Sequence, residues 1–579
     1  MIRESIVKKV LLENNILKPE ELEEILGQSN RKKSDFITYL ITNKTVTENQ
    51  IYNLIAKEYG IPYIDLRGKN LDNKLLELLP ENIVQTHQVV IFEQNTKKNT
   101  IKVATTDPED LQTIDFIKKK TNSCVEIFFT STDSIQSIVQ QYHKGLEQEF
   151  AQISTLPLTD SKQPIDKLNL IAQDVPIIKI MDTLLEYAIF EGASDIHIEP
   201  TEKEIIIRYR IDGILRDVMS FPKSLQAGLI ARVKVLANLK LDEHRLPQDG
   251  RFKIENDQFK VAFRVSIIPV FDGEKIVLRL LDESKQILTL EQLGILEEPL
   301  EILKRNIKKP HGMILVTGPT GSGKTTTLYT AMNILNTPKV NISTVEDPIE
   351  YRMPRVNQSQ INPKIGFTFA MGLRALLRQD PNIIMVGEIR DQETAEIATH
   401  AAMTGHLVLS TLHTNDAAGA IPRLSEMGVA NFLIASTVNI IIAQRLVRKI
   451  CIHCIQSYTL SKKDIQQIEK QFAFQHILDI LEKHHEIPSD GLNVSDINFF
   501  RGVGCARCNH TGYKGRVGIY EILEVDQELA GLISKKELKR EEVYEHALKK
   551  NLITIPQDGF IKAKRGIISI EEVLRVTKE

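Results

Sequence analysis

The chain contains no tryptophan, only five cysteines and a net charge of only −3. So small a charge predicts no nucleic-acid partner. The longest apolar stretches, residues 432–438 and 440–443, are interrupted by Asn439 and end at Gln444 and Arg445. They are far shorter than the roughly 20 residues that a membrane helix needs. We therefore expect no segment that crosses a bilayer.

The first residues, Met1-Ile-Arg-Glu-Ser5, carry charge where a secretory signal would need an apolar stretch. We therefore expect the protein to stay in the cytoplasm. Four of the five cysteines form two CxxC pairs, which in a reducing compartment favours a metal site over disulfides. The fifth, Cys124, lies beside an apolar strand, and we expect it to be a buried core residue.

A chain of 579 residues predicts three or four domains at about 100–200 residues each. Residues 11–22 resemble residues 40–51, which predicts a helix-turn-helix unit used twice within residues 1–70, with Thr47 as a helix cap. This repeat is either a packing module or one that binds a partner or ligand.

Three further domains follow the helical repeat. Strand-like runs at 89–92, 101–104 and 125–129 around a helix at 111–120 predict a small α/β module over residues 71–145. The polar, proline-containing segment 146–170 reads as a linker. An α/β domain over residues 171–290 and a nucleotide-binding domain over residues 291–579 complete a multidomain α/β protein.

The segment Gly318-Pro-Thr-Gly-Ser-Gly-Lys-Thr325 fits GxxxxGK[ST] and follows the apolar run 313–317. A strand, a glycine-rich turn and a helix in this order cradle the phosphates of a nucleotide with backbone N–H groups. Lys324 supplies charge to the terminal phosphates and Thr325 a hydroxyl ligand for Mg²⁺. We predict an ATP and Mg²⁺ site formed by Gly318, Pro319, Thr320, Gly321, Ser322, Gly323, Lys324, Thr325 and Thr326.

Acidic residues follow two of the later strands. Glu346, Asp347 and Glu350 come at the end of a short apolar strand, where a carboxylate can orient or deprotonate water and others can hold Mg²⁺ through water. The run Asn382-Ile-Ile-Met-Val-Gly387 ends in Glu388, which makes an atypical Walker B element because glycine replaces the usual metal-binding aspartate.

Two histidines, His406 and His413, flank a further core strand, and we expect at least one of them to face the γ-phosphate. Each alone would more often be a structural residue.

The pairs Cys451/Cys454 and Cys505/Cys508 supply the four thiolates of a closed tetrahedral zinc site. Such a site has no open coordination position, so the zinc would be structural and would stabilise a subdomain at about residues 446–520. His453 and His510 are alternative ligands. The charged segment 455–501 between the pairs is expected to be rich in helix.

The motifs GPTGSGKTTTLY, TVEDPIEY, LLRQDPNIIMVGEIRD and GHLVLSTLHTNDA resemble the Walker A, Asp box, Walker B and His box of the secretion ATPase superfamily, which drives type II secretion and type IV pili. Upstream matches, such as Ser194-Asp-Ile-His-Ile-Glu-Pro200 and Arg245-Leu-Pro-Gln-Asp-Gly-Arg251, extend the resemblance from about residue 175 to the C-terminus.

The resemblance implies a RecA-like core behind a PAS-like α/β domain, in a homohexamer that acts on an inner-membrane platform protein at the cytoplasmic face of the inner membrane. It implies Glu350 as the catalytic glutamate and Glu388 on the metal side, with His406 and His413 in the His box. Arg210 and Arg216 become candidates for stabilising phosphate charge, although exposed arginines on strands are often plain salt-bridge partners.

Within the family, the tetracysteine element and the long N-terminal region are typical of pilus-extension and type II secretion motors, and retraction motors usually lack them. Some members bind cyclic di-GMP through Arg-Leu-Gly turns of a related N-terminal repeat. The matching places here read Lys9-Val-Leu11 and Thr38-Tyr-Leu40, so we expect docking to a membrane-anchored protein instead.

We therefore expect a pilus-extension motor, with a type II secretion motor as the close rival. A nucleotide-gated scaffold and a zinc-knuckle nucleic-acid translocase are the alternatives from other classes. The complete set of acids disfavours the scaffold, and the lack of basic excess disfavours the translocase.

Overall fold

The computed structural model describes residues 4–141, 175–282 and 287–577 in two compact units. Within these ranges it leaves out residues 15, 19–20, 23–35, 43–45, 77, 80–82, 85–86, 96–97, 140, 256–259, 473, 489–496, 509 and 536–538. Unit 1 is Met1–Asp282 with Cys505–His510, and unit 2 is Glu283–Gly504 with Thr511–Glu579. The expected linker at 146–170 lies outside the described residues. No described helix combines the length and the apolar character needed to span a bilayer.

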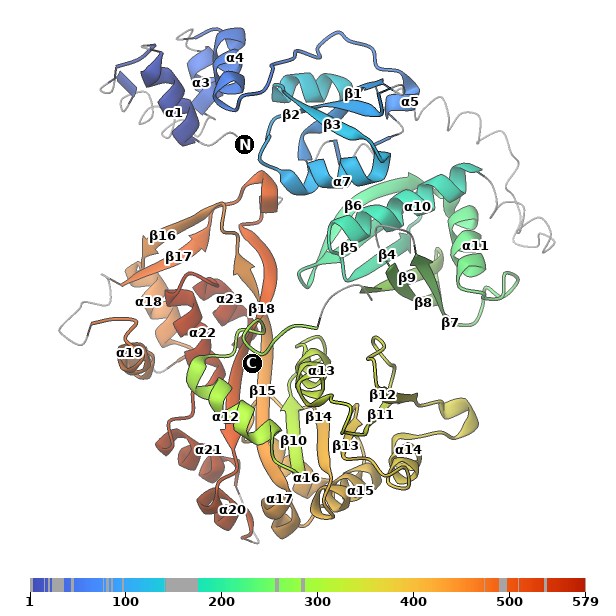
Figure 1. Ribbon diagram of the computed structural model, residues 1–579, viewed down its shortest axis with the longest axis vertical. Coiled ribbons are helices and arrows are strands. Elements are labelled where there is room, and N and C mark those ends of the chain that lie inside the picture. Colours follow the sequence, from blue (N-terminus) through green and yellow to red (C-terminus); the bar gives the residue numbers. More distant parts are fainter. Residues whose placement is uncertain are drawn as a thin grey trace. The chain divides into compact units, whose positions relative to one another are not determined.

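Unit 1 begins with short helices that pack on one another (Figure 1). Leu11 and Leu40, equivalent positions of the predicted repeat, are both fully buried in one apolar cluster. The predicted cap is confirmed, because Thr47 and Gln50 form a reciprocal capping box at the start of α4. These helices are α1 (Glu4–Glu13), α3 (Phe36–Thr42) and α4 (Glu48–Glu58). The short helix α5 (Asn73–Leu76) follows apart from them and belongs to the core of the next module.

A three-stranded sheet follows, in the order β1-β2-β3, with the predicted strands and helix all present. β2 runs antiparallel to β1 and parallel to β3, and α7 makes the crossover between β2 and β3. The elements are β1 (Val89–Asn95), β2 (Thr100–Thr105), α7 (Leu111–Thr121) and β3 (Cys124–Phe129).

The expectation that Cys124 is buried is wrong, because its side chain is exposed. Cys124 is the first residue of β3, which is the edge strand of this sheet, and exposed and half-buried positions alternate from there. An apolar strand beside a cysteine does not decide on which face of the sheet the thiol lies.

The remainder of unit 1 is an antiparallel sheet in the order β6-β5-β4-β9-β8-β7. α10 and α11 pack against each other beside it. Its buried residues join those of the three-stranded module in one continuous core. The elements are α10 (Val175–Phe190), β4 (Asp195–Pro200), β5 (Glu204–Ile211), β6 (Ile214–Pro222), η1 (Lys223–Leu225), α11 (Gln226–Leu236), β7 (Gln248–Glu255), β8 (Lys260–Val270) and β9 (Gly273–Asp282).

Unit 2 is built on a seven-stranded sheet in the order β12-β11-β13-β14-β10-β15-β18. All neighbours are parallel except β15 and β18. The strands are β10 (Gly312–Thr317), β11 (Ile342–Glu346), β12 (Val356–Gln360), β13 (Ile383–Val386), β14 (Leu407–Leu412), β15 (Val438–Ile450) and β18 (Tyr513–Glu524).

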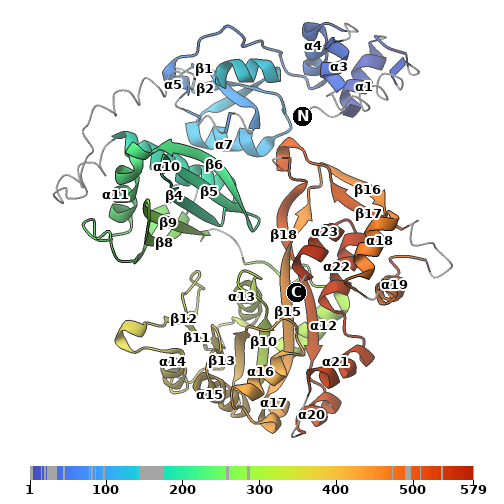
Figure 2. The same cartoon turned by 180° about the vertical axis from the view of Figure 1, so that it is seen from behind.

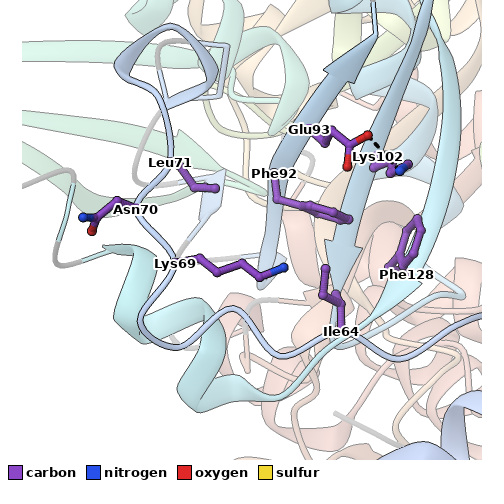
Figure 3. A pocket seen from close by; sticks show the side chains of 8 residues that line it. All are labelled: Ile64, Lys69, Asn70, Leu71, Phe92, Glu93, Lys102 and Phe128. Atoms are coloured by element: carbon purple, nitrogen blue, oxygen red, sulfur yellow. Dashed lines mark ion pairs between the residues drawn. The ribbon is translucent and has the colours of Figure 1, made fainter.

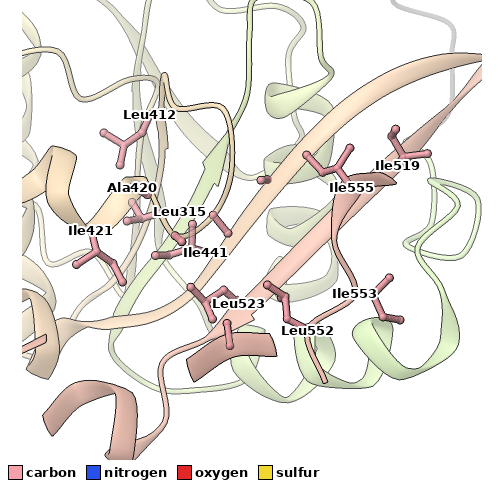
Figure 4. Packing of buried hydrophobic residues seen from close by; sticks show 14 of the residues in the cluster. Leu315, Leu412, Ala420, Ile421, Ile441, Ile519, Leu523, Leu552, Ile553 and Ile555 are labelled. Carbon is pink, nitrogen blue, oxygen red and sulfur yellow. The ribbon is translucent and has the colours of Figure 1, made fainter. Parts of the chain in front are cut away.

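Helices cover both faces of this sheet, because its central strands are apolar on both sides. Met313 and Leu315 of β10 join one cluster with α14 to α17, whereas Ile314 and Val316 join another with α12 and α13. Figure 2 shows α13 beside β10, and Figure 4 shows Leu315 packed near residues such as Ile441. The helices are α12 (Glu297–Ile307), α13 (Lys324–Leu335), η2 (Pro363–Ile365), α14 (Phe369–Leu376), α15 (Gln392–Met403), α16 (Ala420–Glu426) and α17 (Asn431–Thr437).

In its described residues, the segment between the cysteine pairs contains helices, as expected, and also two strands that pair with each other. The described chain then returns along β18 and continues into further helices. These elements are β16 (Ile455–Thr459), α18 (Lys462–Glu469), α19 (Phe474–Lys483), β17 (Asn498–Gly502), η4 (Ala506–Cys508), α20 (Gln527–Ile533), α21 (Arg540–Lys549), α22 (Ile555–Lys564) and α23 (Ile570–Thr577).

A half-buried histidine joins the small α/β module of unit 1 to the part that contains the six-stranded sheet. His87 Nδ1 lies 3.2 Å from Asp110 Oδ2, and His87 Nε2 lies 3.1 Å from Glu191 Oε1, at the end of α10. Burial lowers the pKa of His87, but the hydrogen bonds with Asp110 and Glu191 outweigh burial and raise it to about 9. The imidazolium therefore links the small module to the six-stranded sheet at neutral pH.

We expect His87→Gln to lower the stability of unit 1 at pH 7 by about 2 kcal/mol, because two charge-assisted hydrogen bonds are lost. The contribution is complete below the ordinary pKa of 6.5 and is lost as pH rises through about 9. The difference in melting temperature between the unmodified and H87Q chains should thus shrink from pH 7 to pH 10. His476→Gln, on an exposed helix position, is the control. A difference that stays constant across this range would contradict the assignment.

Candidate functional site

The glycine-rich loop between β10 and α13 has the predicted conformation. Gly318, Gly321 and Gly323 have φ angles of +146°, +77° and +89°, which residues with a Cβ rarely adopt. Lys324 begins α13, and its Nζ donates to the Gly318 carbonyl at 2.8 Å. The loop therefore presents the N-terminus of a 12-residue helix, which is a ready anion-binding position.

The parallel register brings further charged groups to the same edge of the sheet. Glu388 follows β13 and His413 follows β14, and His413 Nε2 lies 2.7 Å from Glu388 Oε1. The other carboxylate oxygen of Glu388 accepts from Arg390 Nε, also at 2.7 Å. Burial lowers the pKa of Lys324, with Glu388 opposing this and Arg445 adding to it, so the charges of Glu388 and Arg445 act on the loop lysine.

His406 lies elsewhere. Leu407 is paired with Gly312 at the start of β10, whereas the loop begins after Thr317 at its end. Five strand residues separate the two edges by about 17 Å. We expect at least one of the two histidines to face the γ-phosphate, and His413 is the one that lies at the edge of the loop. His406 Nδ1 lies 3.0 Å from the Ala401 carbonyl, and a catalytic role for His406 stays a prediction.

The three acids after β11 have different surroundings. Glu346 is buried and accepts from Thr344 Oγ1 at 2.5 Å, from Gln358 Nε2 at 3.1 Å and from the Tyr329 hydroxyl. Asp347 is exposed, and Glu350 is half-buried. Glu346 is thus held by its neighbours as part of the core, which leaves Asp347 and Glu350 as the acids that solvent can reach.

The turn after β14 is tied to the strand that precedes the loop. Thr317 Oγ1 accepts from the Thr414 backbone N–H at 2.8 Å, and the two hydroxyl groups lie 2.6 Å apart. Arg445 donates to the Asn415 carbonyl at 2.9 Å from the neighbouring strand β15. His413 is therefore carried by a turn whose position is fixed relative to the phosphate loop.

The same turn is tied to the C-terminal part of unit 2. Arg540 of α21 forms an ion pair with Asp416, and the Ala417 N–H donates to Glu521 of β18 at 2.9 Å. Glu521 is buried, and burial raises its pKa to about 7.

The two candidate arginines lie on neighbouring strands of unit 1. Arg210 of β5 has its Nε 3.5 Å from Asp195 Oδ2, and Arg216 of β6 is paired with Tyr209. Asp195 is almost fully buried and also accepts from Arg279 Nε at 2.9 Å. An approach of Arg210 or Arg216 to a phosphate stays a prediction.

The four paired cysteines come together as predicted. The Sγ atoms of Cys451, Cys454, Cys505 and Cys508 all lie within 4.8 Å of one another. Those of Cys505 and Cys508 are 3.7 Å apart, close to the roughly 3.8 Å that tetrahedral ligands at 2.3 Å from zinc would have. Cys505 N–H donates to Cys508 Sγ at 3.2 Å, a bond that favours a thiolate.

A separate hollow of about 410 Å³ lies on the three-stranded sheet of unit 1 (Figure 3). Phe92 and Phe128 meet edge to face in it, and Lys102 pairs with Glu93 at 2.8 Å. Lys69 extends along the opposite wall. The hollow contains none of the predicted phosphate-site residues.

Three residues of the site do not follow from the sequence motifs. Arg390 lies within the Walker B motif, where no role is expected for it, and Gln444 and Arg445 end an apolar run. The two polar residues at the end of that run are themselves a signal of a site, since polar residues in a strand that is otherwise buried on both faces need a specific partner.

Glu346→Gln should lower the melting temperature, because an amide NH₂ would then face a hydrogen-bond donor from Tyr329, Thr344 or Gln358. We expect the free energy of unfolding to fall by about 1–3 kcal/mol. Glu350→Gln should lower the melting temperature less than Glu346→Gln does and should abolish ATP turnover. Calorimetry and phosphate release on both purified variants test this. Full turnover in E350Q would show that Glu350 is not the catalytic acid.

Comparisons with known proteins show to which family the chain belongs. A family model described as type II/IV secretion system protein matches residues 171–575, and an MshEN domain model matches residues 59–149. The Type IV pilus assembly ATPase PilB of Myxococcus xanthus is 38% identical over 98% of both chains. The Type II secretion system ATPase E of Vibrio cholerae is 47% identical over 70% of this chain and 76% of that protein.

The solved structure of the ATPase DotB from Yersinia pseudotuberculosis has a TM-score of 0.51 at 22% identity, covering 72% of this chain and 96% of that one. This similarity supports the fold of the ATPase part. The mixed α/β architecture, the phosphate loop with its acids and the family match over most of the chain lead to one conclusion. The chain belongs to the type II/IV secretion system protein family and is an ATP hydrolase.

Proposed function

We propose that the chain is the motor ATPase of type IV pilus assembly, which drives pilin polymerisation at the inner membrane. The observation that carries this proposal is the extent of similarity. Proteins named as type IV pilus assembly ATPases from Myxococcus xanthus and Pseudomonas aeruginosa match 98% and 99% of this chain, including its N-terminal region.

A type II secretion motor that drives a pseudopilus is the second candidate. The secretion ATPase of Vibrio cholerae has the higher identity, at 47%, but over only 406 residues. High identity limited to 70% of the chain fits a shared ATPase engine with a different N-terminal region. We therefore favour the pilus.

In the proposed reaction, Glu350 orients or deprotonates the water that attacks the γ-phosphate of ATP. Lys324 and the backbone N–H groups of the loop hold the phosphates. Thr325 and Glu388 would hold Mg²⁺, which would neutralise phosphate charge when bound. His413 orients the Glu388 carboxylate, and Arg210 and Arg216 would add positive charge when the α/β domain closes.

We further propose a homohexamer at the cytoplasmic face of the inner membrane, in which cycles of closure act on an inner-membrane platform protein. The helical N-terminal repeat would dock to a membrane-anchored assembly protein. The proposal includes neither a nucleic-acid partner nor direct contact with the membrane.

We propose that Cys451, Cys454, Cys505 and Cys508 hold a structural Zn²⁺. The support is chemical: four sulfur atoms gather within 4.8 Å of one another, and three of these residues are buried. The metal would fix the returning β17–β18 segment against the end of β15.

Glu388→Gln should bind ATP with nearly unchanged affinity and hydrolyse it at least about 100-fold more slowly. Glu393→Gln, an exposed glutamate paired with Arg374, is the matched control and should keep full turnover. Equilibrium titration with a fluorescent ATP analogue and steady-state phosphate release separate binding from turnover. Normal turnover in E388Q would remove Glu388 from the site.

The same variants test the function in the cell. Deleting the gene should abolish surface pili in electron micrographs and leave the secreted proteins unchanged, and the E393Q gene but not the E388Q gene should restore pili. Loss of secreted proteins with pili retained would favour the type II secretion motor.

The purified chain should contain about one zinc per chain by mass spectrometry of the metal. Cys505→Ser should lose most of it and melt at lower temperature, because the metal contributes to folding. Cys124→Ser, at an exposed thiol outside the cluster, should retain both the metal and the melting temperature. A metal-free unmodified chain of the same thermal stability would rule out structural zinc.

A further inference from the structure

The side chain of Gln444 is buried directly beneath the phosphate loop. The preceding residue, Ala443, is paired with Thr317 at the end of β10, so β15 continues past the point where β10 turns into the loop. Only 1% of Gln444 is exposed. A primary amide at such a depth has to satisfy its hydrogen bonds within the protein.

Both ends of this amide are bonded to the segment that holds phosphate. Gln444 Nε2 donates to the Ser322 carbonyl at 2.6 Å, and Gln444 Oε1 accepts from Thr327 Oγ1 at 2.7 Å. Ser322 lies in the loop and Thr327 in the first turns of α13. One side chain therefore bridges the loop and the helix that follows it.

Two glycines of the loop lie so close to Gln444 that neither position has room for a side chain. A Cβ on Gly323 would lie 2.8 Å from Gln444 Nε2, and one on Gly318 would lie 2.5 Å from the Gln444 carbonyl oxygen. Both distances are shorter than real Cβ contacts. The loop is thus packed against Gln444 at its beginning and near its end, in addition to the positive φ angles that favour glycine there.

The direction of the Ser322 carbonyl matters for anion binding. A loop that binds phosphate must turn its N–H groups inward and its carbonyl oxygens outward, since an inward oxygen would repel the phosphate. The amide of Gln444 supplies the donor that an outward carbonyl needs in a buried position. This hydrogen bond therefore stabilises the outward orientation of the Ser322 carbonyl, in addition to the backbone conformation of the neighbouring glycines.

We propose that Gln444 is a positioning residue for nucleotide binding, which holds the phosphate loop in its binding conformation without touching the nucleotide. This inference rests on the proposed function only in taking ATP as the ligand. It assigns to β15 a direct part in setting the affinity for the phosphates.

The same strand offers a matched control. Asn439 of β15 donates from Nδ2 to the His311 carbonyl at 2.8 Å, and a Cβ on Gly312 would collide with its amide. Asn439 thus makes the same kind of contact as Gln444, but at the opposite end of β10. Gln444→Glu and Asn439→Asp each replace an amide by a carboxylate. The two variants therefore compare the same chemical change at opposite ends of β10.

The test compares Gln444→Glu with Asn439→Asp in the full chain. Q444E keeps the shape and the acceptor for Thr327 but sets a carboxylate against the Ser322 carbonyl. We expect its Kd for a fluorescent ADP analogue and its KM for ATP to rise about tenfold, with kcat changed less than about threefold. N439D should bind the analogue within about twofold of the unmodified chain. Gel filtration and melting curves confirm that the variants are folded.

A fall in kcat with KM and Kd unchanged would mean that Gln444 is merely structural, because a reduced folded fraction lowers apparent turnover alone. Equal affinity in Q444E and the unmodified chain would also overturn the proposal. If Q444E does not fold, Thr327→Val removes the second bond and also the contact of this hydroxyl with Tyr520, so Tyr520→Phe is its control. A Kd about threefold higher in T327V but not in Y520F supports the proposal, and an unchanged Kd in T327V or an equal rise in Y520F overturns it. If the unmodified chain binds no ATP, the proposed function itself fails.

Discussion

The parallel pairing of β10 with β14 and β15 is the constraint on which the site depends. Parallel strands end at the same edge of a sheet, so the residues that follow β10, β13 and β14 lie close together there, whatever the conformation of the loops. The same pairing separates residues that are close in sequence. His413 lies at this edge and His406 at the other, although both flank one strand.

The acids of unit 2 divide according to burial. Glu346 and Glu521 are almost fully enclosed, and each accepts hydrogen bonds from neighbouring groups. Glu350 and Glu388 are only half-buried, where substrate and water can reach them. A carboxylate that must exchange partners during a reaction needs access that a buried, fully bonded carboxylate lacks. The proposed division between structural and catalytic acids follows this physical difference.

Much of the molecule was predictable from local signals. The glycine-rich loop, the strands around residues 89–129 and the Thr47 cap each depend on residues a few positions apart, and all three were predicted correctly. The error with Cys124 arose because the face of β3 on which its thiol lies depends on how the sheet packs, and not on the apolar residues beside it. The places of His413 and His406 at opposite edges depend in the same way on register with β10.

The role of Gln444 had no local signal beyond its polarity. Its partners, Ser322 and Thr327, lie more than a hundred residues earlier in the chain, and only the sheet order brings them beneath its amide. The clustering of the four cysteines was easier to predict, because the spacing of two CxxC pairs by itself indicates a metal site.

The turn of residues 414–417 has an additional mechanical consequence. One end is fastened to Thr317 beside the loop, and the other to Arg540 and Glu521 among the C-terminal elements. A short peptide anchored at both ends cannot be displaced without pulling on one of its anchors. A displacement of His413, which directly precedes this turn, would therefore strain the contacts with α21 and β18, so the turn couples the edge of the phosphate loop mechanically to the C-terminal helices.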